Sequence, residues 1–240
     1  MWSICKKELQ QFFSNLTGYI TIILFLLVNG IFLFVLNDSN LFDFGYASLD
    51  KFFELAPWIL LFLVPAVTMR SLADEFKGGT FEILQTRPIT KWQIVLGKYI
   101  SILIIMLFVI LPTIIYVITI KSLSAQGGID TGGILGSYIG LFLLAAVFSA
   151  IGLCCSGFTN NAVIAFLISA FTCLILYFGF NALSKLPFFA NGFDYYIEML
   201  GIDFHYRSIS RGVLDSRDLV YFISIIYIFL LITVKNLHKK

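Results

Sequence analysis

The sequence predicts an all-α polytopic membrane protein with six membrane-spanning helices. Of its 240 residues, 59% are hydrophobic and 12% are charged, whereas an average soluble domain carries about a quarter charged residues. The apolar residues gather in continuous runs that reach the length of about 20 residues needed to cross a bilayer. Polar and apolar residues do not alternate within these runs as they do in the strands of a membrane barrel, so each run predicts a helix.

Six runs are suitable as spans, and they predict a single transmembrane domain over residues 1–240. The first run contains no charged residue, and no small-residue cleavage motif follows it. We therefore expect a span there and not a cleaved signal peptide. The second and sixth runs are the shortest. The expected spans are residues 16–36, 52–72, 94–120, 132–155, 162–184 and 218–234.

The segment before the first span, residues 2–14, has an amphipathic pattern. Cys5, Leu9 and Phe12 recur at helical spacing, and lysines and glutamines occupy the opposite side. This pattern predicts a helix that lies in the membrane interface. A positively charged flank of the first span is the alternative interpretation.

The basic residues predict how the spans are oriented. With six spans, both termini share a side with the 70–98 segment and the 156–161 turn, and ten of the sixteen Lys and Arg residues fall on that side. Lys and Arg are enriched in cytoplasmic loops. We therefore expect both termini in the cytoplasm.

Residues 70–98 form a polar segment that is longer than a connection between two spans requires. Gly78–Gly79 predicts the end of the preceding helix, and Thr80 predicts the N-cap of a short helix. Pro88 ends that helix because the residue before a proline avoids helical backbone angles. Thr90, with a glutamine three residues later, predicts a capping box at the start of the next span.

We expect this short helix to lie across the ends of two spans and to direct one set of side chains outward. Those side chains are Phe81, Glu82, Leu84 and Gln85. Two interpretations remain open for the segment. It is either a rigid knob that docks into another protein or a loop folded against the membrane.

The order of these residues resembles the permease subunits of ABC-2-type ABC transporters. The matching positions are Glu75, Gly79, Thr80, Glu82, Leu84, Pro88, Ile89 and Thr90, followed by Gly97 and Lys98. In that family the segment between the second and third spans is a coupling helix that sits in a groove of a separate ATPase subunit. The resemblance therefore implies six ATPase-contact residues, Glu75, Gly79, Thr80, Phe81, Glu82 and Leu84. A solvated acid at the start of a helix is the alternative role for Glu82.

A second long polar segment, residues 184–218, lies on the opposite side. Helical spacing over residues 193–200 predicts an amphipathic helix, either at the outer interface or re-entrant. The resemblance implies short external helices that close the exit of an exporter. Five charged residues before the last span are candidates for an external gate or partner site: Arg207, Arg211, Asp215, Arg217 and Asp218. With Asp203, these residues equally suit a salt-bridged structural cap. Asp215 or Ser216 suits the N-cap of the last span.

More narrowly, the string from Phe204 to Phe222 resembles the GldF family of gliding-motility permeases. The matching positions are Phe204, Ile209, Arg211, Gly212, Asp215, Arg217, Asp218, Tyr221 and Phe222. Related ABC-2 permeases of nitrous-oxide-reductase maturation carry the same string. The resemblance implies a bacterial inner-membrane protein, a second permease or membrane subunit with a large extracytoplasmic domain, and a role in gliding motility.

The chain contains no phosphate-binding loop of the form G-x-x-x-x-G-K-[ST]. Its two histidines, His205 and His238, show no zinc-ligand spacing. We therefore expect no catalytic, cofactor-binding or metal-binding residue in this chain, and we expect ATP and Mg to be bound by a partner ATPase. A net charge of +2 excludes a basic nucleic-acid surface.

The central parts of the spans contain no Asp, Glu, Lys, Arg or His, which argues against a proton-coupled carrier. Asn29 and Asn181 are candidates for residues that line a transport path. Hydrogen bonding between helices is the alternative role for both.

These observations predict the transmembrane permease subunit of an ATP-driven ABC transporter of the ABC-2 exporter type. Such a subunit is not itself an enzyme. In a dimer of permeases with two ATPase subunits, it would couple ATP hydrolysis to transport or to force transmission across the membrane. The alternatives are a non-transporting membrane scaffold or assembly factor, and a passive channel.

Overall fold

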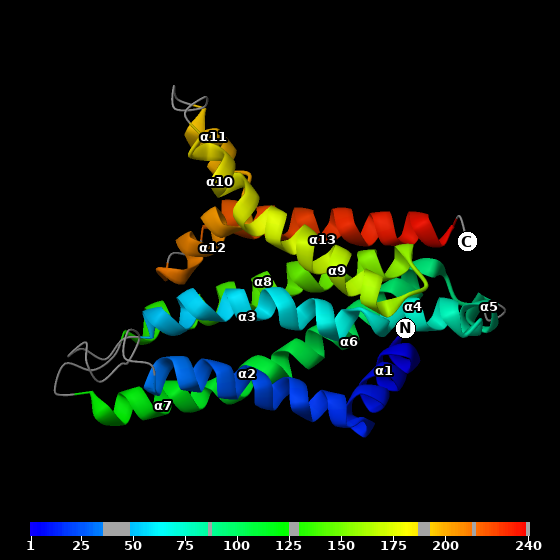
Figure 1. The fold of residues 1–240 in the computed structure, drawn as a ribbon, viewed down its shortest axis with the longest axis horizontal. Helices are drawn as coiled ribbons and strands as arrows, with labels where there is room; N and C mark the ends of the chain where they lie inside the picture. The colour runs from blue at the N-terminus through cyan, green and yellow to red at the C-terminus, as the bar shows by residue number, and fades with distance from the viewer. Residues whose placement is uncertain (36–48, 86–87, 125–129, 187–192, 213–214, 239–240) are drawn as a thin grey trace.

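The computed structural model describes residues 1–35, 49–85, 88–124, 130–186, 193–212 and 215–238 (Figure 1). These residues fold into helices and turns, with no strand among them. Six helical segments are long and apolar enough to cross a membrane, which confirms the all-α fold with six spans. They are Leu16–Phe34, Asp50–Lys77, Lys91–Ser122, Thr131–Phe158, Ala162–Ser184 and Ser216–Leu237.

Three spans are interrupted along their length. In the third span, Pro112 lacks the N–H that continues the helical ladder, and a 3₁₀ turn forms around it. The interrupted spans are α3 (Asp50–Thr68) with α4 (Arg70–Lys77), α6 (Lys91–Ile110) with η1 (Leu111–Thr113) and α7 (Ile114–Leu123), and α9 (Ala162–Leu174) with the π-helical η2 (Ile175–Gly179) and α10 (Phe180–Ser184).

The other three spans are continuous helices, and four shorter helices in the described part of the chain lie outside the spans. The continuous spans are α2 (Leu16–Phe34), α8 (Thr131–Phe158) and α13 (Ser216–Leu237). The shorter helices are α1 (Trp2–Ser14), α5 (Thr80–Gln85), α11 (Asp194–Glu198) and α12 (Ile202–Ser210).

Helix α8 is the central helix of the molecule. It packs against α3, α9, α12 and α13, and 83% of its hydrophobic stretch is buried. Small residues permit this close approach. A Cβ on Gly152 would overlap Oγ1 of Thr68 in α3, and a Cβ on Gly140 would lie 2.9 Å from Cγ2 of Ile209 in α12.

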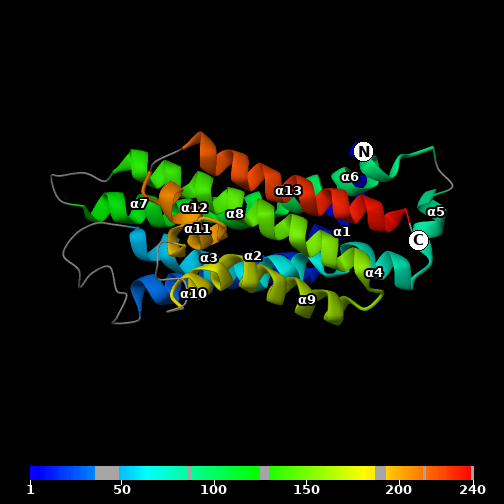
Figure 2. The same cartoon turned by 90° about the horizontal axis from the view of Figure 1, so that it is seen from above.

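Both chain ends lie at the same end of the helix bundle, together with α4 and α5 (Figure 1). Helix α12 and the C-terminal part of α7 lie toward the opposite end, and the view from above agrees (Figure 2). An even number of spans requires this arrangement of the termini.

Helix α1 turns away from α2 at Asn15 (Figure 1). On one face of α1, Ile4 and Cys5 are buried, and Leu9 and Phe12 pack against the core. The lysines and glutamines of its other face are exposed. The helix predicted over residues 2–14 is thus confirmed, and its apolar face lies against the spans.

Candidate functional site

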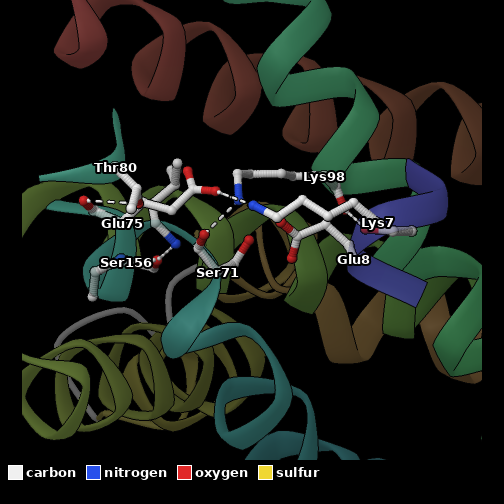
Figure 3. Close-up of polar contacts among 10 residues, drawn as sticks. Lys7, Glu8, Ser71, Glu75, Thr80, Lys98 and Ser156 are labelled. Carbon is white, nitrogen blue, oxygen red and sulfur yellow. Dashed lines mark hydrogen bonds and ion pairs between the residues drawn. The ribbon is translucent and has the colours of Figure 1, made fainter. Parts of the chain in front are cut away.

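A buried charge cluster lies where α1, α4 and α6 meet, at the end of the molecule that carries both termini (Figure 3). Lys98 of α6 is fully buried. Its Nζ lies 2.8 Å from Glu8 Oε1 of α1 and 2.9 Å from Glu75 Oε1 of α4, and it donates a hydrogen bond of 2.7 Å to the carbonyl oxygen of Ser71. With Lys7, these residues form what we term the Lys98 cluster.

The charges of the Lys98 cluster balance. Lys7 Nζ lies 3.3 Å from the same Glu75 oxygen that Lys98 contacts, so two lysines face two glutamates. A buried ammonium is stable only when opposite charges and acceptors replace its water. Lys98 therefore holds α1, α4 and α6 in one fixed arrangement.

A fourth helix joins this junction through Ser156 of α8. Its Oγ accepts hydrogen bonds from the backbone N–H of Leu72 at 2.8 Å and of Ala73 at 3.3 Å. The N–H groups in the first turn of a helix have no partner within that helix. Ser156 supplies the missing acceptor for α4, which is why α4 can start anew after the break at Met69.

Helix α5 follows α4 through the predicted glycine turn. Gly79 has a φ of +64°, a conformation that side chains with a Cβ disfavour. Thr80 Oγ1 donates to the carbonyl oxygen of Glu75 at 3.4 Å. The rings of Phe76 and Phe81 meet edge to face with their centroids 5.0 Å apart. These contacts anchor α5 on α4.

One expectation for α5 is wrong. Phe81 was expected on the outward face, but it is buried with 4% of its surface exposed, because it packs against Phe76. Glu82 is exposed, as expected. The side chains of Leu84 and Gln85 lie outside the described part of the chain.

The six predicted ATPase-contact residues therefore fall into different environments. Glu75 and Phe81 are buried within the chain, whereas Gly79, Thr80 and Glu82 are exposed at its end. Sequence reasoning identified Glu75 but not its partners Glu8 and Lys98 as site residues. The sequence shows Lys98 at the edge of an apolar run and Glu8 on an amphipathic helix. Neither pattern indicates that these two residues form a pair.

At the opposite end, Asp203 of α12 is the centre of a second polar group. Arg207 approaches it with two nitrogens, Nη2 at 2.7 Å from Oδ2 and Nε at 3.0 Å from Oδ1. Asn181 Nδ2 of α10 donates to Oδ2 at 3.2 Å. Asp203 is buried and so is Tyr206 beside it; burial, and then the charge of Asp203, raise the pKa of Tyr206.

A buried histidine–aspartate pair joins α12 to the last span. His205 Nδ1 lies 2.6 Å from Asp218 Oδ1, and Nε2 lies 2.9 Å from the carbonyl oxygen of Met199. The imidazole stacks on Tyr221 at 3.9 Å between ring centroids. Sequence reasoning assigned no role to His205, because only the fold brings its two acceptors together.

The remaining external candidates are exposed. Asp215 accepts a hydrogen bond from the N–H of Arg217 and caps α13, as predicted. Arg211 and Arg217 form no ion pair with any described residue. The expected salt-bridged cap is therefore limited to Arg207 with Asp203, since Asp218 faces His205 instead.

The two candidate path residues have protein partners. Asn29 is fully buried, and its Nδ2 donates to the carbonyl oxygen of Phe25 at 2.7 Å within α2. Its Oδ1 has no hydrogen-bond partner among the described residues. Asn181 links α10 to α12 through Asp203.

Comparison with known proteins identifies the family. No curated protein matches the chain. A family described as "ABC-2 family transporter protein" matches residues 2–195, which include α5 and all members of the Lys98 cluster. This match spans well over half of the chain, so the chain belongs to the ABC-2 family of transporter proteins.

Proposed function

We propose that this ABC-2 permease receives the motion of its ATPase subunit through α5 and passes it to the spans through the Lys98 cluster. Membership of the family makes the chain the membrane subunit of an ABC transporter, associated with an ABC ATPase and not itself an ATPase domain. ATP and Mg would be bound by that partner. The observation that carries the proposal is the position of α5. It lies at the end of the molecule, next to α4, which the buried ion pairs of the Lys98 cluster join to α6.

The contacts provide a continuous path from α5 to three spans. Phe81 and Thr80 fix α5 to α4. Glu75 of α4 is tied to α6 through Lys98, and the start of α4 is tied to α8 through Ser156. A displacement of α5 would therefore move α4, α6 and α8 together.

The exposed residues of α5 and its turn are the proposed ATPase contacts. Glu82, Gly79 and Thr80 are exposed, and Leu84 belongs to the same short helix. Glu75 and Phe81 would support the contact from within because both are buried. In this arrangement Glu82 is the charged group available for pairing with a basic residue of the ATPase.

The proposal requires α5 and both termini to face the cytoplasm, where ATP is available, in the inner membrane of a bacterium. The excess of Lys and Arg at that end supports this orientation.

The four cysteines of the chain are buried and unpaired, so single introduced cysteines report on topology. A membrane-impermeant maleimide should label Arg211→Cys in intact cells and Glu82→Cys only after permeabilisation. The reverse pattern would contradict the orientation.

The complex of permease and ATPase would either transport a substrate to the outside or exert force on an outer partner. Gliding motility, with a second permease or membrane subunit that has a large extracytoplasmic domain, is the specific role that the string before the last span supports. In that case the exposed Arg207, Arg211, Asp215 and Arg217, with the buried Asp218, would form the external gate or partner site. Asn29 and Asn181 would respond to span movement as the polar groups nearest a transport path.

Co-purification with the ATPase tests the docking assignment. Glu82→Arg should reduce the ATPase recovered with the tagged permease about tenfold, because a like charge at an interface is strongly unfavourable. Deletion of residues 78–86 should abolish recovery. Glu54→Arg is the matched control, since Glu54 is also exposed but lies on α3 near the opposite end. Unchanged recovery in both test variants would refute docking through α5.

The same preparation separates the alternative functions. A scaffold or assembly factor would bind envelope partners without changing the ATPase rate. A passive channel would conduct ions in lipid bilayers without ATP. A coupled permease should instead alter the ATPase rate of the complex, and Glu82→Arg should remove that effect.

A further inference from the structure

A cavity of about 340 Å³ opens beside the Lys98 cluster, between α1, α2, the α3–α4 junction and α6. Its apolar lining residues include Ile20, Val67, Ile102 and Ile105. Its polar lining residues include charged side chains from α1 and α4. The volume falls within the range of about 300–1,000 Å³ that is typical of small-ligand sites.

The cavity lies at the level where the polar helix α1 passes into the apolar span α2. Asn15, Thr17 and Thr21, at this transition, all line it. The first residue of α2 is Leu16, so this level is where a membrane-spanning helix enters the hydrocarbon region. An occupant that matches both the apolar and the charged lining residues is therefore an amphiphile with its polar end toward α4.

Two charges on α4 lack partners within the described chain. Arg70 and Asp74 are one helical turn apart, both line the cavity and both are exposed. Opposite charges at this spacing commonly pair, but these two form no ion pair with each other or with another described residue. The cavity thus presents a separate cation and a separate anion to any bound molecule.

A third polar group points to the same conclusion. Ser71 lines the cavity, and its Oγ is shielded from solvent and has no hydrogen-bond partner among the described residues. Buried hydroxyls usually have a partner, because leaving one unpaired is unfavourable. A rotation of the Ser71 side chain on binding would bring Oγ within reach of a ligand oxygen and satisfy it.

We propose that this cavity binds the phosphoethanolamine headgroup of a membrane phospholipid. Arg70 contacts the phosphate, and Asp74 accepts hydrogen bonds from the ammonium. The acyl chains run over Ile20 and Ile105 toward the bilayer. The cavity shares Glu8 and Ser71 with the Lys98 cluster, but lipid binding does not depend on the role of that cluster in ATPase coupling.

The other common headgroups fit the same residues less well. A phosphocholine group has no N–H to donate to Asp74, and quaternary ammonium groups are usually held by several aromatic faces; Phe12 is the single aromatic residue of the described lining. A phosphoglycerol group would pair its phosphate with Arg70, but its uncharged glycerol would leave Asp74 without a cation. Selectivity for phosphoethanolamine follows from these differences.

Native mass spectrometry of the purified full-length chain, with no ATPase present, tests the site. The chain is mixed with phosphatidylethanolamine, phosphatidylcholine and phosphatidylglycerol of identical acyl chains. The wild type should retain phosphatidylethanolamine about fivefold more than the other two, the size expected for partly exposed charge contacts. Arg70→Gln should lower retention of all three lipids, whereas Asp74→Asn should lower only that of phosphatidylethanolamine.

A steric variant and two controls complete the experiment. Ala66→Trp fills the cavity without changing charge, because Ala66 lines it and is exposed, and it should reduce phosphatidylethanolamine retention in the same way. Lys121→Gln and Glu54→Gln, near the opposite end, should change nothing. Equal retention of the three lipids, or an unaltered preference in Asp74→Asn, would overturn the proposal. So would equally tight binding of glycerophosphoethanolamine, since that compound has no acyl chains.

Discussion

At the residue scale, Lys98 shows how a full charge is kept inside a membrane protein. Its ammonium has no contact with solvent, and its acceptors come from helices that are distant in sequence, Glu8 lying 90 residues earlier and Ser71 lying 27 residues earlier. Transfer of an unpaired ammonium from water to such a site would be strongly unfavourable. Its two carboxylate partners offset that cost only while α1, α4 and α6 keep their present arrangement.

Removing the lysine should therefore destabilise the protein more than removing a partner at the surface. Lys98→Met leaves Glu8 without its cation and Glu75 with only the largely exposed Lys7, and we expect the free energy of unfolding to fall by about 3 kcal/mol. Lys7→Met should lower it by less than about 1 kcal/mol, because Lys7 is 56% exposed. Thermal unfolding in detergent measures both changes.

The double variant gives the internal control. Adding Glu8→Gln to Lys98→Met removes the carboxylate that has lost its cation, since Lys7 remains beside Glu75, and should recover part of the lost stability. Equal melting temperatures for the wild type and Lys98→Met would show that the cluster does not stabilise the junction.

At the scale of single elements, the helix boundaries of this chain depend on neighbouring residues and were therefore predictable. The Thr90 capping box, the Asp215 cap and the glycine turn before α5 each involve groups no more than four residues apart. The inward direction of Phe81 was not predictable in this way. The direction of the Phe81 side chain depends on how α5 packs against Phe76. The sequence pattern of a six-residue helix does not determine this packing.

Gly79 is the residue on which the position of α5 depends most directly. Its φ of +64° is disfavoured for residues with a Cβ by about 1–2 kcal/mol, and no neighbouring atom lies within 4 Å of a Cβ built there. The effect of Gly79→Val is therefore conformational and not steric crowding. We expect amide hydrogen exchange in α5 to accelerate about tenfold.

Gly78→Ala is the matched control for this exchange measurement. Gly78 has an ordinary φ of −88°, and a Cβ there would lie 3.2 Å from the carbonyl oxygen of Asp74. Exchange in α5 should change little. If both variants accelerated exchange equally, loss of glycine itself and not the left-handed turn would be responsible.

At the scale of the whole molecule, hydropathy predicted the number of spans but not their arrangement. The third span is the most hydrophobic of the six, yet only 39% of its hydrophobic stretch is buried, against 83% in α8. Lipid accepts apolar side chains as readily as a protein core does, so hydropathy does not distinguish the two surroundings. The better indicator of the central helix is its content of glycine, alanine and serine.

Close packing of α8 against α3 should therefore be sensitive to a single methyl group. In Gly152→Ala the added Cβ would overlap Thr68 Oγ1 and lie 2.9 Å from Thr68 Cβ, and we expect a loss of about 1–3 kcal/mol in the free energy of unfolding. Thr68→Ala in the same chain should restore part of it. Chemical or thermal unfolding of the purified protein measures these values.

A second glycine of the same helix provides the comparison. At Gly157 a Cβ would meet its nearest neighbours at 3.5 Å, an ordinary van der Waals distance. Gly157→Ala should leave stability nearly unchanged. Similar losses for both substitutions would point to helix flexibility and not to the α3–α8 contact.

The length of α8 has a consequence for how the two ends of the molecule communicate. Its 28 residues make an unbroken rod of about 42 Å. Near one tip Ser156 holds the start of α4, and near the other Ser137 donates to the carbonyl oxygen of Ser210 in α12. Because a rigid helix is held at both ends, a tilt at one end displaces the other. Any step that moves α4 should therefore be measurable as a movement of α12 on the far side of the membrane.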